Sequence, residues 1–315
     1  MEVNKTASGS ENINDFKDFE DFEILDEEML PPVNEVKRFF KVFFRRKIVI
    51  FCTVIVLLFL ILAVFQKQIA PYDPNEQNLV NFLVSPSAEH LLGTDALGRD
   101  LFSRIIYGTR IAMSVGVAAV IVSAAIGTFL GLIAGYTEGI IGTIIMRFND
   151  ALMAIPSLIL TLMIAQVLQS GVTGIIVAIS ISLFPGYIRM AYGQVLSLKQ
   201  NDYVMAARSM GAKNTRIILR HLLPNCLSPL IVQMTMMIGI AILAEAGLSF
   251  LGLGIKPPTP AWGSMCYDGY KYLLSRPLLS LAPGFVIMLL VLSFNMVGDG
   301  LRDALDPRMR GTSTN

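Results

Sequence analysis

Charged side chains are scarce in this sequence. Asp, Glu, Lys and Arg make up only 16% of its 315 residues, whereas they account for about a quarter of an ordinary soluble domain. Hydrophobic residues make up 54% of the chain, and the mean hydropathy is +0.61. Much of the protein surface must therefore face something other than water. The net charge of +1 gives no electrostatic argument for a nucleic acid as partner, and we expect none.

Metal-ligating and catalytic side chains are also rare. The chain has two histidines, His90 and His221, and three widely spaced cysteines that form no CxxC pair, Cys52, Cys226 and Cys266. A zinc or redox site is therefore not expected, and we predict neither a metal nor another cofactor. The cysteines are interpreted as small apolar packing residues. The sequence shows no HExxH, Ser/His/Asp or paired-carboxylate arrangement, so we assign no catalytic residue.

Long apolar stretches, by contrast, are abundant. A helix that crosses the hydrocarbon core needs about 20 predominantly apolar residues, because unsatisfied backbone groups cannot face lipid. Six stretches meet this requirement: Ile48–Phe65, Ile111–Gly135, Ala151–Leu168, Ile175–Tyr192, Leu230–Leu253 and Leu281–Val297. We therefore predict an all-α, polytopic membrane protein with six transmembrane helices, one N-terminal helix followed by a five-helix core.

The distribution of Lys and Arg predicts the orientation of these helices. Six basic residues crowd the start of the first span and place the N-terminus in the cytoplasm: Lys37, Arg38, Lys41, Arg45, Arg46 and Lys47. Six crossings then return the C-terminus to the same side, together with the basic segment 193–229. Arg99, Arg104 and Arg110 run against this pattern, because they fall on the predicted outer side. Their segment is long enough to form surface structure of its own.

The same reasoning divides the chain into five parts. Residues 1–36 are rich in Asp and Glu and are interpreted as a disordered acidic cytoplasmic tail rather than a signal peptide. Residues 37–66 form the first transmembrane helix with its basic flank, and residues 67–110 an extracytoplasmic segment. Residues 111–300 form the transmembrane core, and residues 301–315 a cytoplasmic C-terminus.

The inner loop between the fourth and fifth spans is more structured than a connection requires. Its sequence is NDYVMAARSMGAKNTRIILRHLLP. Asn201 or Asp202 is a good N-cap for a short helix over Tyr203–Met210, and Gly211 stands where a helix ends in a left-handed residue. A second amphipathic stretch follows, with apolar and basic residues on opposite sides, and Pro224 is expected to end it.

A few residues at membrane depth could serve function or packing alone. Glu245 lies inside the fifth apolar stretch, where a charge costs about 2.5–3.5 kcal/mol unless it faces protein or a wet cavity. It is interpreted either as a residue that lines a translocation pathway or as a polar clasp between helices. Pro156 and Pro185 interrupt the third and fourth spans and free carbonyl groups that could line the same pathway. Helix kinking alone explains both prolines equally well.

Other residues near the spans carry weaker signals. Gly127 and Gly131 form a GxxxG pattern that favours close helix packing. Arg147 and Asp150 flank the start of the third span and are interpreted as interfacial anchors or local partners. Trp262 is predicted to be a belt residue at the membrane interface, with contact to an external protein as the alternative.

The inner loop resembles the EAA loop of ABC-importer permeases, whose pattern is Glu-Ala-Ala, three further residues, Gly, and later Leu-Pro. The matching positions are Ala206, Ala207, Gly211, Leu223 and Pro224. Met205 stands where the family has its acidic residue. Four other segments resemble the dipeptide and oligopeptide branch of these permeases: His90–Arg110, Met146–Leu160, Ala244–Met265 and Phe294–Arg308.

This resemblance implies a permease subunit that forms half of a translocation pathway for di- or oligopeptides across the bacterial cytoplasmic membrane. It implies a heterodimer with a second homologous permease, two ATP-binding subunits inside, a substrate-binding protein outside, and contact with membrane lipid. ATP hydrolysis would belong to the ATP-binding subunits, because this chain has no GxxxxGK[ST] loop.

Residues 201–224 would then be the loop that couples ATP hydrolysis to transport. The resemblance assigns this role to seven residues: Asp202, Met205, Ala206, Ala207, Arg208, Gly211 and Ala212. A methionine cannot form an ion pair, so packing around Ala206, Ala207 and Gly211 is predicted to transmit the force.

Two alternatives remain open. Nickel-importer permeases share this architecture, and the sequence does not decide the cargo. A secondary transporter driven by an ion gradient would be a different class, but it predicts inverted repeats and several membrane-depth carboxylates. The sequence shows neither clearly.

Overall fold

The computed structural model describes residues 35–137, 139–168 and 171–305, and their regular structure is helical. Nearly all of the predicted acidic tail and residues 306–315 lie outside the described residues. Among the described residues, five helices are long and apolar enough to cross a membrane: α2 (Lys47–Val64), α4 (Leu101–Tyr136), α7 (Val172–Leu198), α10 (Leu223–Phe250) and α12 (Leu278–Leu305). The prediction of an all-α polytopic membrane protein is confirmed.

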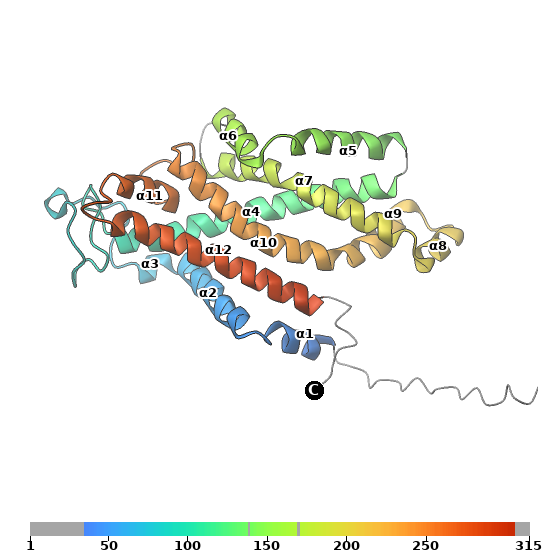
Figure 1. Cartoon of the computed structure of the whole chain (residues 1–315), viewed down its shortest axis with the longest axis horizontal. Helices are drawn as coiled ribbons and strands as arrows, with labels where there is room; N and C mark the ends of the chain where they lie inside the picture. The colour runs from blue at the N-terminus through green and yellow to red at the C-terminus, as the bar shows by residue number, and fades with distance from the viewer. Residues whose placement is uncertain (1–34, 138, 169–170, 306–315) are drawn as a thin grey trace, which may run out of the picture.

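The long helices form an elongated bundle with two different ends (Figure 1). One end carries α8 (Asp202–Ser209) and α9 (Asn214–Ile217) and is called the loop end. The other carries residues 70–100 and α11 (Trp262–Tyr270) and is called the segment end. The starts of α2 and α10 and the last turns of α4, α7 and α12 all lie toward the loop end (Figure 1). The helices therefore alternate in direction, as the six predicted crossings require.

The third predicted span is not one straight helix. Its residues divide between α5 (Ile140–Met153) and α6 (Ser157–Val167), which are bent by 92° with respect to each other. Pro156 stands at the break, because proline lacks an N–H and disfavours helical backbone in the residue before it. The 11 residues of α6 extend about 16 Å, too little to cross a core of about 30 Å. α4 ends at the loop end and α7 begins at the segment end (Figure 1). The bent α5–α6 pair therefore returns the chain from the loop end to the segment end.

The second span is longer than predicted. α4 starts at Leu101, ten residues before the predicted start at Ile111, so the last part of the predicted extracytoplasmic segment is helical. Its 36 residues correspond to about 54 Å, which exceeds the thickness of the hydrocarbon core. The helix therefore projects beyond the core and can support structure outside the membrane.

A row of glycines on α4 lets α7 approach closely. A Cβ atom on Gly127 would lie 2.6 Å from the Phe184 carbonyl oxygen, and one on Gly131 would lie 2.6 Å from that of Ile188. Gly135 continues the row against Val195. Near the middle of the pair, the buried Ser180 hydroxyl donates to the Ala119 carbonyl at 3.1 Å. The predicted close packing at the GxxxG pattern is confirmed, and α7 is its partner.

Trp262 is not a belt residue, in contrast to the prediction. Its side chain is 1% exposed, and the indole N–H donates to the Ile105 carbonyl of α4 at 3.0 Å. Gly108 makes room for the ring, because a Cβ there would lie 2.6 Å from the indole. Phe59 of α2 packs edge-on against the same ring. Trp262 therefore ties α11 to α4 and α2 inside the chain.

The cysteines behave as packing residues. Cys52 and Cys226 are buried, and Cys266 in α11 is partly buried; all three are free. Burial raises the pKa of the Cys266 thiol to about 11, so it stays protonated at neutral pH.

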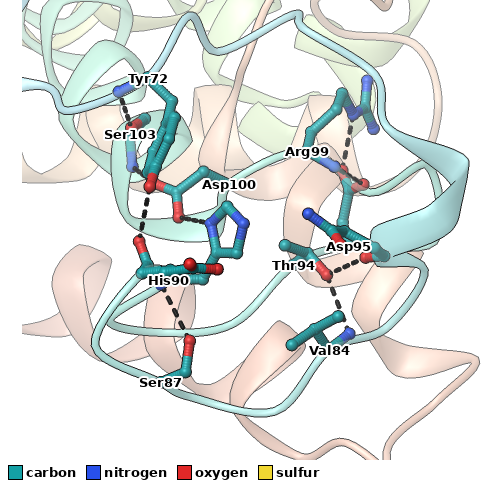
Figure 2. Close-up of polar contacts among 11 residues, drawn as sticks. Tyr72, Val84, Ser87, His90, Thr94, Asp95, Arg99, Asp100 and Ser103 are labelled. Carbon is teal, nitrogen blue, oxygen red and sulfur yellow. Dashed lines mark hydrogen bonds and ion pairs between the residues drawn. The ribbon is translucent and has the colours of Figure 1, made fainter.

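Two carboxylates hold the segment end in shape, the buried Asp100 and the partly buried Asp95. The side chain of Asp100 caps α4 by accepting from the Ser103 N–H at 2.7 Å, and its other oxygen lies 2.9 Å from Nδ1 of His90 (Figure 2). The Tyr72 N–H donates to the Ser103 hydroxyl at 3.1 Å, and the Tyr72 hydroxyl donates to the Glu89 carbonyl. Residues up to 31 positions apart in sequence are thereby fastened to the first turn of α4.

The second carboxylate, Asp95, pairs with two of the three arginines that oppose the predicted orientation. Asp95 accepts from the Arg99 guanidinium at 2.7 Å and from the Leu97 and Arg99 backbone N–H groups. Arg104 lies 3.7 Å from the same carboxylate and donates to the Pro74 carbonyl at 2.8 Å. Arg99 and Arg104 are thus buried beside one carboxylate, which offsets one of their two positive charges, while Arg110 is exposed on α4.

We expect a single methyl group in the α4–α7 contact to destabilise the protein. Gly131→Ala forces backbone atoms apart and should lower the unfolding free energy by about 1–3 kcal/mol, seen as a fall in the melting temperature of the detergent-solubilised chain. Gly193→Ala is the matched control, because Gly193 is an α7 glycine with nothing within 4 Å of its Cβ position. Equal melting temperatures for the two variants would contradict the proposed role of close packing.

Candidate functional site: the loop between α7 and α10

Helix α8 begins where α7 has left the bundle. Asn201 is its N-cap, with extended backbone and a carbonyl that accepts from the N–H groups of Val204 and Met205. The helix therefore runs over Asp202–Ser209, one residue earlier than predicted at each end. Met205 occupies the fourth helical position rather than the third, so even a carboxylate there would not complete a capping box.

Gly211 ends this helix as predicted. Its φ is +77°, in the left-handed region that glycine adopts without a steric penalty. The Gly211 N–H donates to the Arg208 carbonyl and the Ala212 N–H to the Ala207 carbonyl, at 3.0 and 3.1 Å. These two bonds make a Schellman motif, which satisfies the last carbonyls of α8 and turns the chain sharply toward α9.

Pro224 does not end the second amphipathic stretch, in contrast to the prediction. α9 runs into a π-helical turn over Ile218–Leu222 and then directly into α10, which carries Pro224 in its first turn. Proline is tolerated there because it has φ suited to a helix, and the wider π turn removes the need for its missing N–H. The loop is thus joined to a transmembrane helix without a flexible break.

Side-chain contacts fasten the loop to two transmembrane helices. The Tyr136 hydroxyl at the end of α4 donates to the Asn214 side chain at 3.0 Å. The Asn225 amide of α10 donates to the Tyr203 hydroxyl at 3.4 Å, and the Tyr203 ring lies 6.4 Å from that of His221. These contacts hold α9 against the end of α4 and α8 against the start of α10.

The two alanines of the motif differ in exposure. Ala207 is 6% exposed and, with Val204, packs toward the rest of the chain, whereas Ala206 is exposed. Met205 is 50% exposed and Met210 is 81% exposed. Packing of Ala207 against a partner, part of the sequence prediction, is therefore not possible in this conformation. The surface open to a partner is formed by Tyr203, Met205, Ala206 and Met210, and we call it the docking face.

Polar residues surround the docking face. Asp202, Arg208 and Gly211 are exposed, while Ala212 is half-buried beneath the turn. Lys213, Arg216 and Arg220 are also exposed and give the neighbourhood a positive charge. Tyr203 and Met210 escaped the sequence analysis. The signal that could have found them is the presence of large side chains in a loop that is otherwise rich in polar and basic residues.

The candidates at membrane depth lie in three different settings. Glu245 is 1% exposed and accepts from the Ser249 hydroxyl at 2.7 Å, while that hydroxyl accepts from the Ile255 N–H. The side chain thus fastens the end of α10 to the turn after it and does not reach the surface of this chain. Pro185 is buried within α7, and Pro156 is exposed at the break between α5 and α6.

An ion pair joins α5 to α7, and the sequence predicted only one of its two residues. Asp150 accepts from Arg189 at 2.7 Å, and both side chains are about half exposed. Asp150 was expected to have a local partner, but Arg189 lies 39 residues away, inside the predicted fourth span. A charged residue in an apolar stretch was the signal that could have found it. Asp150 also lines a cavity between the ends of α4, α5 and α7, together with Arg147, Tyr192 and Lys199.

Comparison with protein families identifies the chain. The model for "binding-protein-dependent transport system inner membrane component" matches residues 127–311, more than half of the sequence and all of the loop just described. The chain belongs to this family of ABC-importer permeases. A second model, for the N-terminal transmembrane domain of oligopeptide transport permease C, matches residues 36–86.

Similar proteins cover most of the permease. A dipeptide transport system permease protein of Alkalihalophilus pseudofirmus is 43% identical over 90% of this chain and 93% of its own. A glutathione transport system permease protein of Pectobacterium atrosepticum is 42% identical over 87% and 91%. An inward-facing structure of the MetNI methionine ABC transporter superposes with a TM-score of 0.54 at 18% identity, over 64% of this chain and 96% of that one. That structure shows a shared fold.

Membership of this family implies ATP-binding and substrate-binding partner proteins and a place in the inner membrane. The five long apolar helices and the bent α5–α6 pair agree with that place.

The two alanines of the docking loop should respond differently to a charge. Ala207→Asp buries a carboxyl without a partner and should lower the unfolding free energy by at least about 2 kcal/mol. Ala206→Asp places the same group in water and should leave the melting temperature of the purified permease unchanged. The reverse order of stabilities would contradict the burial described here.

Proposed function

We propose that this permease forms half of a translocation pathway for short peptides, powered by ATP hydrolysis on partner subunits. The observation that carries this proposal is the pair of relatives more than 40% identical over nearly the whole chain, which are named as dipeptide and glutathione permeases. Dipeptides and glutathione share a compact backbone with peptide bonds and free carboxylates. A short peptide is therefore the cargo class that fits both names.

In this proposal the loop end faces the cytoplasm and the segment end faces outward. The basic residues before α2 and in the loop 201–224 support this orientation through the positive-inside rule. Two arginines of the segment end, Arg99 and Arg104, lie buried beside Asp95, which offsets one of their two charges, so they oppose it less than their number suggests. A second homologous permease completes the pathway, two ATP-binding subunits bind inside, and a substrate-binding protein delivers cargo to the segment end.

The docking face transmits the movement of the ATP-binding subunits. Its methionines offer flexible, polarizable surface that adapts to a partner groove, and the surrounding basic residues favour an acidic rim on that partner. The docking face contains no acidic residue, so apolar packing supplies the contact. The Schellman turn, the continuous helix into α10 and the Tyr136–Asn214 bond then carry the displacement to the transmembrane helices.

The Arg189–Asp150 pair is the best candidate for contact with the cargo. A charged pair facing lipid would be costly, so its exposed side faces a wet pathway or the second permease. A guanidinium and a carboxylate side by side also match the two termini of a zwitterionic peptide. Pro185 in α7 and the break between α5 and α6 allow the helices that carry this ion pair to bend.

Transport should depend on ATP and on peptide. In liposomes that contain the permease with its partner subunits, we expect ATP-dependent uptake of a radiolabelled dipeptide, measured by filtration. Uptake driven by an ion gradient without any ATP-binding subunit would contradict the proposal. Uptake of nickel in place of peptide would instead favour the metal-importing alternative.

The docking face can be tested with matched charge substitutions. Met205→Lys together with Met210→Lys should reduce co-purification of the ATP-binding subunits at least about tenfold, because two lysines desolvate poorly against an apolar groove. Leu274→Lys is the control, since Leu274 is fully exposed at the segment end. The docking role fails if the double variant retains its ATP-binding subunits and still couples ATP hydrolysis to uptake.

A further inference from the structure

Helix α1 (Glu35–Phe43) presents three rows of side chains, and one row holds it to the bundle. Phe43 is buried and Phe39 and Val42 are partly buried against the last turns of α12. The contact is close at Gly300, where a Cβ would lie 3.3 Å from the Phe43 ring. This row fixes the direction in which the other two rows point.

The second row is apolar and uncovered. Val36, Phe40 and Phe44 follow one another at intervals of four residues, so they lie on one side of the helix. They are 65%, 53% and 39% exposed. The rings of Phe40 and Phe44 stack with 6.1 Å between centroids, and the Phe44 N–H still donates to the Phe40 carbonyl. The row is therefore a continuous apolar surface rather than scattered exposed residues.

The third row is basic and adjoins the second. Lys37, Lys41 and Arg45 each follow one residue after a member of the apolar row, at the same spacing of four, and all three are exposed. Within the part of the chain that the structure describes, Lys41 and Arg45 form no ion pair. An apolar row beside a basic row is the composition of a helix that binds at a membrane interface.

The position of α1 agrees with that composition. Only three residues separate it from α2, and Arg46 among them pairs with Asp303 at the end of α12 at 3.0 Å. The apolar exposure of α1 continues directly into α2, where Ile48 and Phe51 are exposed. α1 therefore lies at the level where the first transmembrane helix leaves the bilayer.

We propose that α1 docks on the membrane surface and selects anionic lipids. Val36, Phe40 and Phe44 enter the boundary between acyl chains and headgroups, while Lys41 and Arg45 bind headgroup phosphates. The membrane is chosen as the occupant because the basic row complements anionic headgroups and the apolar row is continuous with a transmembrane helix. The inference rests on the membrane location of the permease and not on its cargo.

The test places a reporter on the apolar row of the full-length chain. The chain has one tryptophan, Trp262, which is 1% exposed, so Phe40→Trp adds a distinct exposed indole. The variant is reconstituted in vesicles of phosphatidylcholine with 30% phosphatidylglycerol on both leaflets, which makes the insertion direction irrelevant. Either lipid is supplied with dibrominated acyl chains, which quench an indole in contact with them. Phe44→Trp provides a second reporter if the first variant does not fold.

We expect brominated phosphatidylglycerol to quench the added indole at least about twice as strongly, per mole of lipid, as brominated phosphatidylcholine. Lys41→Gln with Arg45→Gln should remove this preference while quenching persists. The control pair Lys67→Gln with Lys256→Gln, which removes two exposed lysines toward the segment end, should keep it.

Three outcomes would overturn the proposal. In the first, neither brominated lipid quenches the added indole. In the second, both lipids quench it equally in the variant that keeps Lys41 and Arg45. Quenching that appears only after removal of residues 1–34 would instead mean that the acidic N-terminal segment covers α1. Because the assay contains neither peptide nor ATP-binding subunits, none of these outcomes bears on the proposed transport function.

Discussion

Gly127, Gly131 and Gly135 let α4 and α7 lie backbone against backbone over much of their length. In a bilayer there is little hydrophobic gain from bringing two helices together, so van der Waals contact at short range must hold them. The two helices make the most extensive contact between any two helices of the described residues. α10 packs on both of them, and α2 and α11 reach α4 through Phe59 and Trp262.

Both ends of the α4–α7 pair carry structure outside the hydrocarbon core. At the segment end, Asp100 caps α4 and holds His90, so the extended residues before the helix are attached to its first turn. At the loop end, Tyr136 holds Asn214 beside the docking face. One long helix thus links the region proposed to receive the binding protein with the region proposed to receive the ATP-binding subunits. A movement at one end need not travel through flexible loops.

The periphery of the bundle is built differently. α5 and α6 form a bent pair whose sharp break at Pro156 leaves polar backbone near the Arg189–Asp150 pair. α1 and α2 present apolar surface that the rest of the chain does not cover. These outer elements are the ones with surface available for lipid, cargo or a second permease, whereas residues such as Glu245 and Trp262 serve the interior.

Composition, hydropathy and motif spacing were enough to predict the all-α membrane class, the family and the helix–glycine–helix loop between α7 and α10. These predictions rest on local features: hydropathy over about 20 residues, the helix–glycine–helix pattern around Gly211 and the GxxxG pattern. Such features depend on neighbouring residues in the sequence and therefore do not require knowledge of the tertiary structure. The sequence did not reveal that Ala207 is buried while Ala206 is exposed, that Trp262 is buried, or that Arg189 meets Asp150. It also treated Pro224 as a stop and Ala151–Leu168 as one helix. Each of these depends on which neighbour a side chain meets or how a proline is accommodated, and only the packing of distant helices decides that.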